Sequence, residues 1–271
     1  MKRNVLILLV AFFPGFWMMP SVTEVHGACR NPNVAELGDP WLRPAAASGF
    51  VEIEWFGHAF FRITSSSGTR IITDPFGYMG FPVPDVWPHV VTVGKETRNH
   101  SNVALAKGDP IILRGQKSWG ADWSQINTFV RDVLIYNVPI HVRLPYEQVK
   151  GSAFVFELDG ICIGHTGDVG EAFNEDQLEL IGHIDVLLVP IGGTYSAGPE
   201  EAKQIVEQLK PKIVVPMHYW YRTNVLESFV DGRHPARFFE SNKFTVSKDT
   251  LPPTTEIFVL KVTRQGRDDD F

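Results

Sequence analysis

The sequence predicts a domain of the α/β (α+β) class. Short apolar segments of strand length fall into two series along the chain, and in the second series they alternate with helical segments. The chain has 271 residues, which is enough for one large domain with a sizeable core. Its net charge of −6 and the lack of a basic stripe argue against nucleic acid as a partner.

Residues 1–27 have the character of a signal peptide. Lys2 and Arg3 give a positive start, and residues 5–19 are almost wholly apolar but too short and too interrupted by proline to span a membrane comfortably. We therefore expect cleavage at the end of this segment and export to the periplasm or the medium. Lipid attachment at Cys29, or an uncleaved anchor, is the alternative, although the residues before Cys29 match a lipid-attachment signal poorly.

The remaining chain divides into three parts. Residues 28–49 form a lead-in, residues 50–263 hold the ordered domain, and the charged tail 264–271 is expected to be disordered. The chain has two cysteines, and Cys162 lies inside an apolar segment, where it is expected to act as a small buried hydrophobe. A disulfide between Cys162 and Cys29 would need an oxidising compartment, and we do not expect it.

The first series of strands begins at Phe50 and returns through a Ser-Ser-Ser-Gly hairpin turn to Asp74. His58 follows one of these strands and Asp74 ends another, so both are candidates for a role behind a functional site. An Asp before a Pro is an ordinary start of a turn, however, and structural roles are favoured for both residues.

Three strands each lead into a residue of metal-ligand type, namely His100, Asp168 and His218. Their apolar runs are Val90–Val93, Ile161–Ile163 and Ile213–Val215. Sheet folds place functional side chains at strand ends, where a rigid scaffold aims them, so we expect the three residues to form one metal site. The alternative is that they are a helix N-cap, a turn Asp and a strand-end His with ordinary hydrogen bonds.

Two helical segments separate the later strands. Asn174 is the expected N-cap of the first, and Gly182 is expected to end it. The second begins with Pro199 in its first turn. Apolar residues at 3, 4 and 7 spacing give the second segment one buried face: Ala202, Ile205, Val206 and Leu209.

Four segments at the ends of expected strands carry a family resemblance. They are Trp55-Phe56-Gly57-His58, Ile72-Thr73-Asp74-Pro75, His165-Thr166-Gly167-Asp168 and Pro216-Met217-His218-Tyr219. Together they resemble the metallo-β-lactamase-fold hydrolases, and within these the L-ascorbate-6-phosphate-lactonase-like branch. The resemblance implies a four-layer αβ/βα sandwich of two mixed β-sheets with helices outside, and a zinc-dependent site.

The segment from Lys95 to His100 departs from the pattern of that family. The family carries His-x-His-x-Asp-His here, which supplies ligands to two zinc ions, whereas this chain has Lys95, Thr97, Asn99 and His100. An ammonium group has no lone pair to offer a metal, and a Thr hydroxyl is a weak neutral ligand. The first metal position is therefore degenerate. His141 is its only remaining candidate, but it is out of register by one residue, and a core or surface histidine is favoured.

The second metal position implied by the resemblance is more complete. His100, Asp168 and His218 would form it, with Asn99 as a further candidate. Two imidazoles and one carboxylate suffice for one catalytic zinc ion with an open coordination place. Iron or manganese suits the same donors, and a site without metal is the remaining alternative. His165 could either orient Asp168 or face the cleft.

We therefore expect a metal-dependent hydrolase of an ester, a lactone or a phosphoester, with at most one metal ion. A metal at this position would lower the pKa of bound water toward ~7 and so provide the attacking hydroxide. Asp168 and Lys95 are the expected catalytic residues, with Lys95 balancing carboxylate charge and polarising an oxygen of a small anionic substrate. The alternative is a catalytically inactive protein of the same fold that binds a small anionic ligand.

Overall fold

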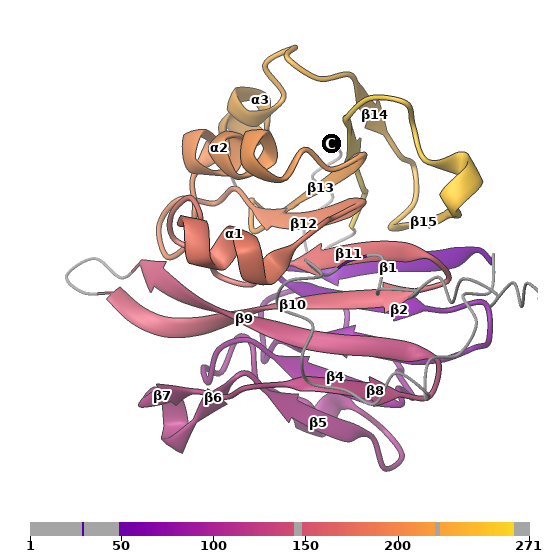
Figure 1. Cartoon of the computed structure of the whole chain (residues 1–271), viewed down its shortest axis with the longest axis vertical. Coiled ribbons are helices and arrows are strands. Elements are labelled where there is room, and N and C mark those ends of the chain that lie inside the picture. The colour runs from indigo at the N-terminus through magenta and orange to yellow at the C-terminus, as the bar shows by residue number, and fades with distance from the viewer. Residues whose placement is uncertain (1–28, 30–48, 144–147, 220–222, 263–271) are drawn as a thin grey trace, which may run out of the picture.

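Two mixed β-sheets pack face to face in this fold, and the described α-helices pack on the outer side of one of them (Figure 1). The computed structural model describes residue 29 and residues 49–143, 148–219 and 223–262. The predicted signal peptide, most of the lead-in and the charged tail lie outside the described residues. The prediction of an α/β sandwich of two mixed sheets is confirmed.

The first sheet has six strands, and it carries one half of the candidate site. In spatial order they are β15 (Lys243–Val246), β1 (Val51–Gly57), β2 (Phe60–Thr64), β3 (Arg70–Thr73), β4 (Val90–Val93) and β5 (Ile111–Arg114). Neighbours from β15 to β3 are antiparallel, whereas β3, β4 and β5 run parallel to one another. Buried and half-buried residues alternate along β1, which is the pattern of a strand with one face on the core.

The second sheet has eight strands, and its central strands are parallel. In spatial order they are β14 (Ala236–Phe238), β16 (Glu256–Val259), β13 (Ile213–Met217), β12 (Val186–Pro190), β11 (Ile161–His165), β10 (Gln148–Leu158), β9 (Val133–Arg143) and β8 (Asn127–Val130). Every residue of β11, β12 and β13 is buried, as in parallel strands that are covered on both faces. A small ribbon of β6 (Gln116–Lys117) and β7 (Asp122–Trp123) lies beside β10.

The α-helices of the described chain all belong to the half that builds the second sheet. They are α1 (Glu175–Ile181), α2 (Pro199–Leu209) and α3 (Thr223–Phe229). Asn174 caps α1 and Gly182 ends it, Pro199 opens α2, and the apolar face of α2 is buried, so these predictions are confirmed. Within the described residues, no helix combines the length and the apolar character needed to cross a membrane.

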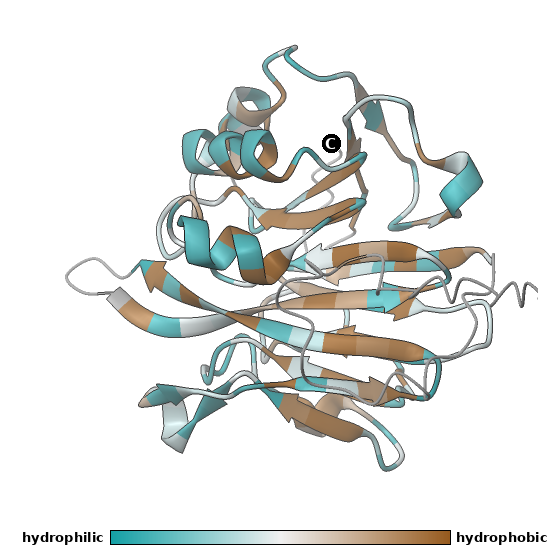
Figure 2. Cartoon of the chain, viewed as in Figure 1, coloured by the Kyte–Doolittle hydropathy of each residue, from teal (hydrophilic) through white to brown (hydrophobic). Residues whose placement is uncertain are grey.

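One large apolar cluster fills the space between the sheets. Ile53 and Phe61 of the first sheet and Phe154 and Ile163 of the second are all fully buried in it. Figure 2 shows the same division, with apolar strands in the middle and polar helix surfaces outside. Burial of this cluster fixes the two sheets against each other, and with them the turns at their strand ends.

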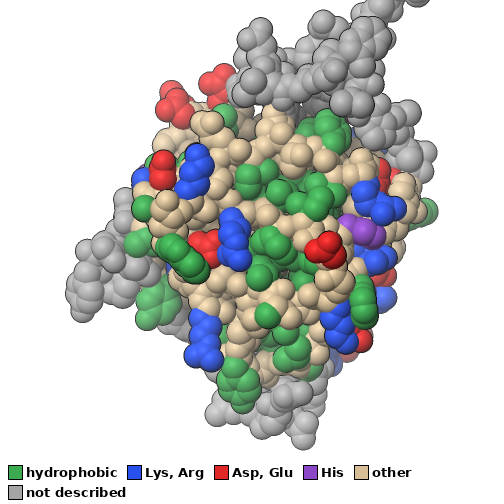
Figure 3. All heavy atoms as spheres, turned by 90° about the horizontal axis from the view of Figure 1, so that it is seen from below, with side chains coloured by type: hydrophobic (Ala, Val, Ile, Leu, Met, Phe, Trp, Pro, Cys, Tyr) green, Lys and Arg blue, Asp and Glu red, His purple; other side chains and the backbone are tan. Residues whose placement is uncertain are grey.

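The face seen in Figure 3 mixes apolar side chains with scattered charges. β5 is the last strand of its sheet in the described chain, and Ile111 on this strand is 49% exposed. Lys and Arg side chains are dispersed over the face and do not form a stripe. Dispersed charge of this kind is ordinary for the surface of a globular domain.

Cys29 and Cys162 form a disulfide bond, so the expectation that they would not pair is wrong. Both side chains are fully buried, and the backbone carbonyl of Cys29 accepts a hydrogen bond from the amide of His183 at 2.8 Å. The sequence pattern missed the pair because Cys29 lies 133 residues from Cys162 and ahead of the first strand. The bond attaches Cys29 to β11, the strand that runs toward Asp168.

Removal of this disulfide should destabilise the protein. The crosslink spans 133 residues, so its loss frees the unfolded chain and should lower the free energy of unfolding by about 2–4 kcal/mol. Cys29→Ala tests this in urea denaturation, since it leaves Cys162 to fill its place in the core. Wild-type protein treated with reductant is the control. A variant with the wild-type midpoint would contradict the prediction.

Candidate metal centre

The candidate site lies where the carboxyl ends of parallel strands from both sheets meet. On the first sheet, β3 leads into Asp74, and β4 leads into the turn that carries His100. On the second sheet, β11, β12 and β13 lead to Asp168, to residues 192–196 and to His218. Parallel strands bring their carboxyl ends to one edge of a sheet, so residues far apart in the sequence converge here.

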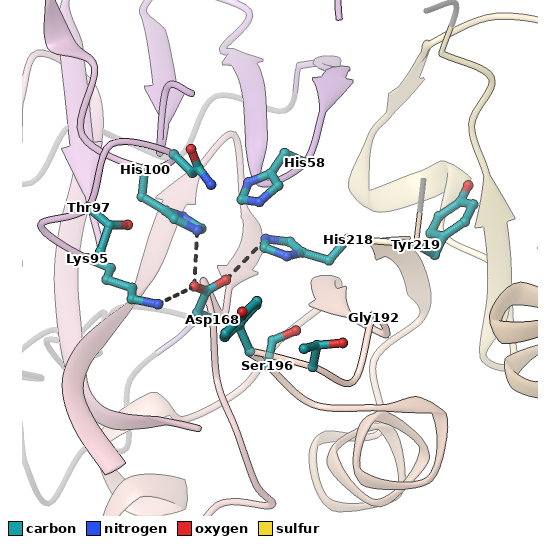
Figure 4. Close-up of a pocket in the computed structure, with 12 residues that line it drawn as sticks. His58, Lys95, Thr97, His100, Asp168, Gly192, Ser196, His218 and Tyr219 are labelled. Atoms are coloured by element: carbon teal, nitrogen blue, oxygen red, sulfur yellow. Dashed lines mark hydrogen bonds and ion pairs between the residues drawn. The ribbon is translucent and has the colours of Figure 1, made fainter. Parts of the chain in front are cut away.

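Three histidines form the centre of the site (Figure 4). One ring nitrogen from each of His58, His100 and His218 lies within 4.8 Å of the other two. The ring centroid of His58 is 3.8 Å from that of His218 and 4.6 Å from that of His100. His58 and His100 are buried, and the side chain of His218 is 9% exposed. Imidazole nitrogens this close together are a donor set suited to a transition metal ion.

Asp168 lies beside these histidines and is shared among three partners. Its Oδ2 accepts a hydrogen bond from Lys95 Nζ at 2.9 Å and lies 3.1 Å from His100 Nε2. Its Oδ1 lies 3.2 Å from His218 Nε2, yet neither of these two buried atoms has a hydrogen bond among the described residues. Lys95 therefore neutralises one oxygen of the carboxylate and leaves the other beside His218 (Figure 4).

Asp74 sets the orientation of His100. Its Oδ2 lies 2.9 Å from His100 Nδ1, and its Oδ1 accepts a hydrogen bond from the amide of Gly94 at 2.6 Å. A carboxylate on Nδ1 directs Nε2 of the same ring into the site, and this arrangement is found behind metal-binding histidines. Asp74 thus contacts a site residue directly, in addition to the turn-forming role expected of it.

Burial and neighbouring charges separate the pKa values of the site residues. Burial lowers the pKa of His58 well below its usual value, and lowers that of His218 to about 4. Burial also disfavours the charged form of His100, but the carboxylates of Asp168 and Asp74 outweigh it and raise the pKa to about 9. Burial opposes ionisation of Asp168, yet His100 and the other cations nearby hold its pKa well below normal. At neutral pH without metal, His58 and His218 are neutral and His100 is an imidazolium between two carboxylates.

Three site residues adopt a left-handed backbone conformation. The φ angle is 54° at His58, 39° at Asp74 and 67° at His218. This conformation costs a residue with a Cβ about 1–2 kcal/mol. Such strain clusters at functional sites, where the surrounding structure enforces it. Each of these residues follows a strand, and the left-handed step turns its side chain toward the site.

The cluster lines a cavity of about 370 Å³, which is a size suited to a small molecule. Asp168 and Lys95 lie in its wall and pair with each other, beside the imidazolium of His100. The rest of the wall, beyond the histidines, consists of backbone and of hydroxyl, amide and aromatic side chains. These residues are Thr97, Asn99, Gly192, Thr194, Tyr195, Ser196 and Tyr219.

Most of the residues singled out in the sequence converge on this cavity. Lys95, Asn99, His100, Asp168 and His218 all line it, and their chemical roles stay predictions. The sequence predicted that they converge, because each follows an apolar strand and the carboxyl ends of parallel strands lie at one edge of a sheet.

The structure places His58 at the centre of the site, where the sequence suggested only a supporting position. A structural role was the favoured expectation, but its ring belongs to the histidine cluster. The available signal is Gly57, whose φ of 105° allows the abrupt turn between β1 and β2. Ser196 also lines the cavity, and the sequence signal that could have found it is the Gly192-Gly193 turn after β12, at the same edge.

Two other histidines lie away from the cavity. His141 is half-buried on β9, and its ring packs edge-on against Trp123 with centroids 5.3 Å apart. His165 is fully buried, and its Nε2 lies 2.9 Å from the carbonyl oxygen of Ala59. His165 therefore contacts the turn that carries His58 and does not reach the cavity wall.

The chain is similar to several known proteins. A family model described as "Beta-lactamase superfamily domain" matches residues 52–218. A UPF0173 metal-dependent hydrolase of Pyrococcus furiosus is 34% identical over 194 residues, which are 62% of this chain and 84% of that relative. A second, of Thermococcus onnurineus, is 35% identical over 195 residues with the same coverage, 62% and 84%.

Solved structures give the same picture. A candidate zinc-dependent hydrolase of the metallo-β-lactamase superfamily from Thermotoga maritima is 32% identical, with a TM-score of 0.59, and the match covers 78% of this chain and 100% of that one. A metallo hydrolase from Ignicoccus hospitalis is 22% identical, with a TM-score of 0.54 and coverage of 73% and 99%, and it shares the fold.

The pKa values of the site predict a pH dependence for the metal-free protein. The folded-state pKa of His100, about 9, lies above its unfolded value of 6.5. Its contribution to stability is therefore fully present below pH 6.5 and is lost as the pH rises to about 9. NMR titration of the imidazole rings should show His100 titrating near pH 9 and His218 near pH 4.

Asp74→Asn is the matched control for this titration, since it removes one of the two carboxylates that hold the His100 proton. The variant should lower the pKa of His100 and leave the fold intact. A wild-type His100 that titrates at or below pH 6.5 would contradict the contacts with Asp74 and Asp168.

Proposed function

We propose that this chain, which belongs to the β-lactamase superfamily, is a metal-dependent hydrolase of a small-molecule substrate. The observation that carries the proposal is the convergence of three histidine nitrogens within 4.8 Å of one another on the cavity wall. The relatives named above are themselves called metal-dependent hydrolases, which supports the same reaction class.

The donor atoms present suit one transition metal ion. His58 and His218 have lowered pKa values because they are buried, so both rings are neutral and offer lone pairs. His218 Nε2 and Asp168 Oδ1 are buried without a hydrogen bond among the described residues, as expected of atoms that face a cation. His58, His100 and His218 would hold the ion, and Asp168 would supply a carboxylate oxygen beside it. His58 thereby joins the ligand set expected from the sequence.

A zinc, iron or manganese ion bound there would supply an activated water for hydrolysis. The residues of the chain supply orientation and charge. Asp74 holds the His100 ring with Nε2 facing the site. Lys95 pairs with Asp168 Oδ2 and keeps that carboxylate ionised beside the histidines. The buried setting strengthens each of these interactions, because little water screens them.

Lys95 also argues for a single metal ion. Its ammonium lies 2.9 Å from Asp168 Oδ2, so a built-in cation already neutralises the carboxylate oxygen on that side of the site. Thr97 and Asn99, which also line the cavity, are weak neutral donors. A second metal ion would have to displace Lys95 and bind without an imidazole from this turn.

The charges of a loaded site favour an anionic substrate. A divalent ion together with Lys95 outweighs the carboxylates of Asp74 and Asp168 by one positive charge, once His100 is neutral. An ester, lactone or phosphoester that carries an anionic group would therefore be attracted to the cavity. Lys95 is placed to polarise an oxygen of such a substrate. The narrower resemblance to the L-ascorbate-6-phosphate-lactonase-like branch stays a prediction.

Export from the cytoplasm is part of the proposal. The disulfide between Cys29 and Cys162 supports it, because buried disulfides persist in oxidising compartments such as the periplasm and the medium. The same bond argues against the lipid-anchored alternative, since the sulfur of Cys29 is already bonded to Cys162.

A second candidate function is binding of a small anionic ligand without turnover. One observation favours a site that functions without metal: Lys95 and the imidazolium of His100 together balance Asp74 and Asp168, so no metal ion is needed to neutralise the buried carboxylates. In that case the cavity would act as a neutral polar binding pocket.

Metal content separates the two functions. Protein purified from metal-replete cells should carry close to one zinc, iron or manganese ion per chain by elemental analysis. The loaded protein should hydrolyse a chromogenic aryl ester or aryl phosphate, and chelation should abolish that activity. A protein without bound metal after metal-replete expression supports the binding function. Two tightly bound ions per chain would contradict the single-ion site.

The histidines themselves can be ranked by substitution. His218→Ala and His58→Ala should each lower metal affinity by more than roughly 100-fold, because a ligand is lost outright. His141→Ala is the matched control, since His141 lies outside the cavity and should leave affinity unchanged. Competition with a chromogenic chelator measures all three. Equal losses in His141→Ala and His218→Ala would overturn this ligand set.

A further inference from the structure

The turn that carries His58 is held in an unfavourable conformation. His58 has a φ of 54° and follows Gly57, which has a φ of 105°. The Phe81 ring packs so closely on Gly57 that a Cβ there would meet it at 2.6 Å. A left-handed residue with a Cβ relaxes unless its surroundings oppose it, so the surroundings must fix the direction of the His58 ring.

Three side chains donate hydrogen bonds to the two carbonyls of this turn. Trp55 Nε1 donates to the carbonyl of His58 at 3.0 Å. Thr73 Oγ1 donates to the carbonyl of Ala59 at 2.8 Å, and His165 Nε2 lies 2.9 Å from the same oxygen. A carbonyl only accepts, so the ring of His165 carries its proton on Nε2. Trp55 and Thr73 come from the first sheet, whereas His165 ends β11 of the second.

A packing role alone does not account for a histidine at position 165. The Ala59 carbonyl already accepts from Thr73, so it needs no second donor to be satisfied. The Nδ1 atom of His165 is buried without a hydrogen bond among the described residues, a cost that an apolar side chain would avoid. The ring nevertheless reaches across the two sheets to the residue next to His58.

We infer that His165 is a positioning residue: through the Ala59 carbonyl it fixes the His58 ring in the histidine cluster. In this way His165 connects His58, the proposed metal ligand on the first sheet, to β11. This strand of the second sheet leads to Asp168. The inference rests on the proposed metal-dependent function, because the His58 ring is positioned toward a metal ion. Burial also lowers the pKa of His165, in keeping with a neutral ring that donates from one nitrogen.

The experiment uses Co²⁺ as a spectroscopic probe in the full chain. His165→Leu removes the donor and should weaken Co²⁺ affinity roughly 10- to 100-fold, as loss of a supporting residue behind a ligand does. Its visible spectrum should approach that of His58→Ala. His165→Gln keeps an N–H donor and should recover most of the affinity. Combined with His58→Ala, the His165→Leu change should have no further effect on affinity.

Thr166→Val is the matched structural control. Thr166 is fully buried beside His165, and its Oγ1 donates to the carbonyl of Leu188 on β12 at 3.1 Å, away from the His58 turn. This variant should bind Co²⁺ like the wild type. Equal losses in Thr166→Val and His165→Leu, or full affinity in His165→Leu, would overturn the inference.

The outcome stays separate from the proposed function. A wild-type protein that binds no Co²⁺ contradicts the proposed function. The positioning role of His165 is then tested on the metal-free protein. Ring NMR of that protein should show the proton of His165 on Nε2, and His165→Gln should shift the His58 resonances less than His165→Leu. A proton on Nδ1 of His165, or His58 resonances unmoved in His165→Leu, would reject the positioning role even if His165→Leu is too unstable for metal titration.

Discussion

The carboxylate of Asp168 is the group on which the site depends, because residues of both sheets share it. Lys95 and His100 reach its Oδ2 from the first sheet, and His218 lies against its Oδ1 from the second. Without this carboxylate, two buried cationic groups would lose their common partner, which is a costly arrangement in a protein interior. The apolar core positions the sheets, and Asp168 joins them electrostatically at the edge where the strands end.

Protonation and metal binding are coupled at this site. In the metal-free protein, the chain from Asp74 through His100 to Asp168 is held together by a proton on His100. A metal ion can use Nε2 of His100 only after that proton leaves, so the two cations compete for one ring. Lys95 stays compatible with both forms, since its contact is with the oxygen of Asp168 that does not face His218.

Much of the fold was predictable from sequence, because its signals are local. Apolar runs of strand length, the Asn174 cap and the Pro199 helix start each appear where the pattern indicates them. The same logic brought His100, Asp168 and His218 to one edge. Features that depend on tertiary contacts were not predictable. Cys29 precedes β1 and stands apart from the described strands, so nothing local points to its partner.

The placement of His58 was hidden for a related reason. A Gly-His pair between two strands reads as an ordinary turn, and only the packing of Phe81 on Gly57 and the donors to the turn show that its direction is enforced. His141 is the opposite case, and the sequence already favoured a core or surface histidine there. Its position in the sequence resembles a family ligand, yet its strand carries it to the Trp123 side of the sheet. In both cases the backbone path, and not the residue type, decides the role.

Activity and thermal stability make opposite demands on site residues with a left-handed backbone. Glycine adopts positive φ without the penalty that His58 and His218 bear, so at these two positions it relieves backbone strain and removes the functional group together. Selection for heat resistance alone would therefore favour glycine at these positions. The metal centre would be lost while the fold became more stable. A thermostabilised version of this protein has to be selected for metal retention at the same time.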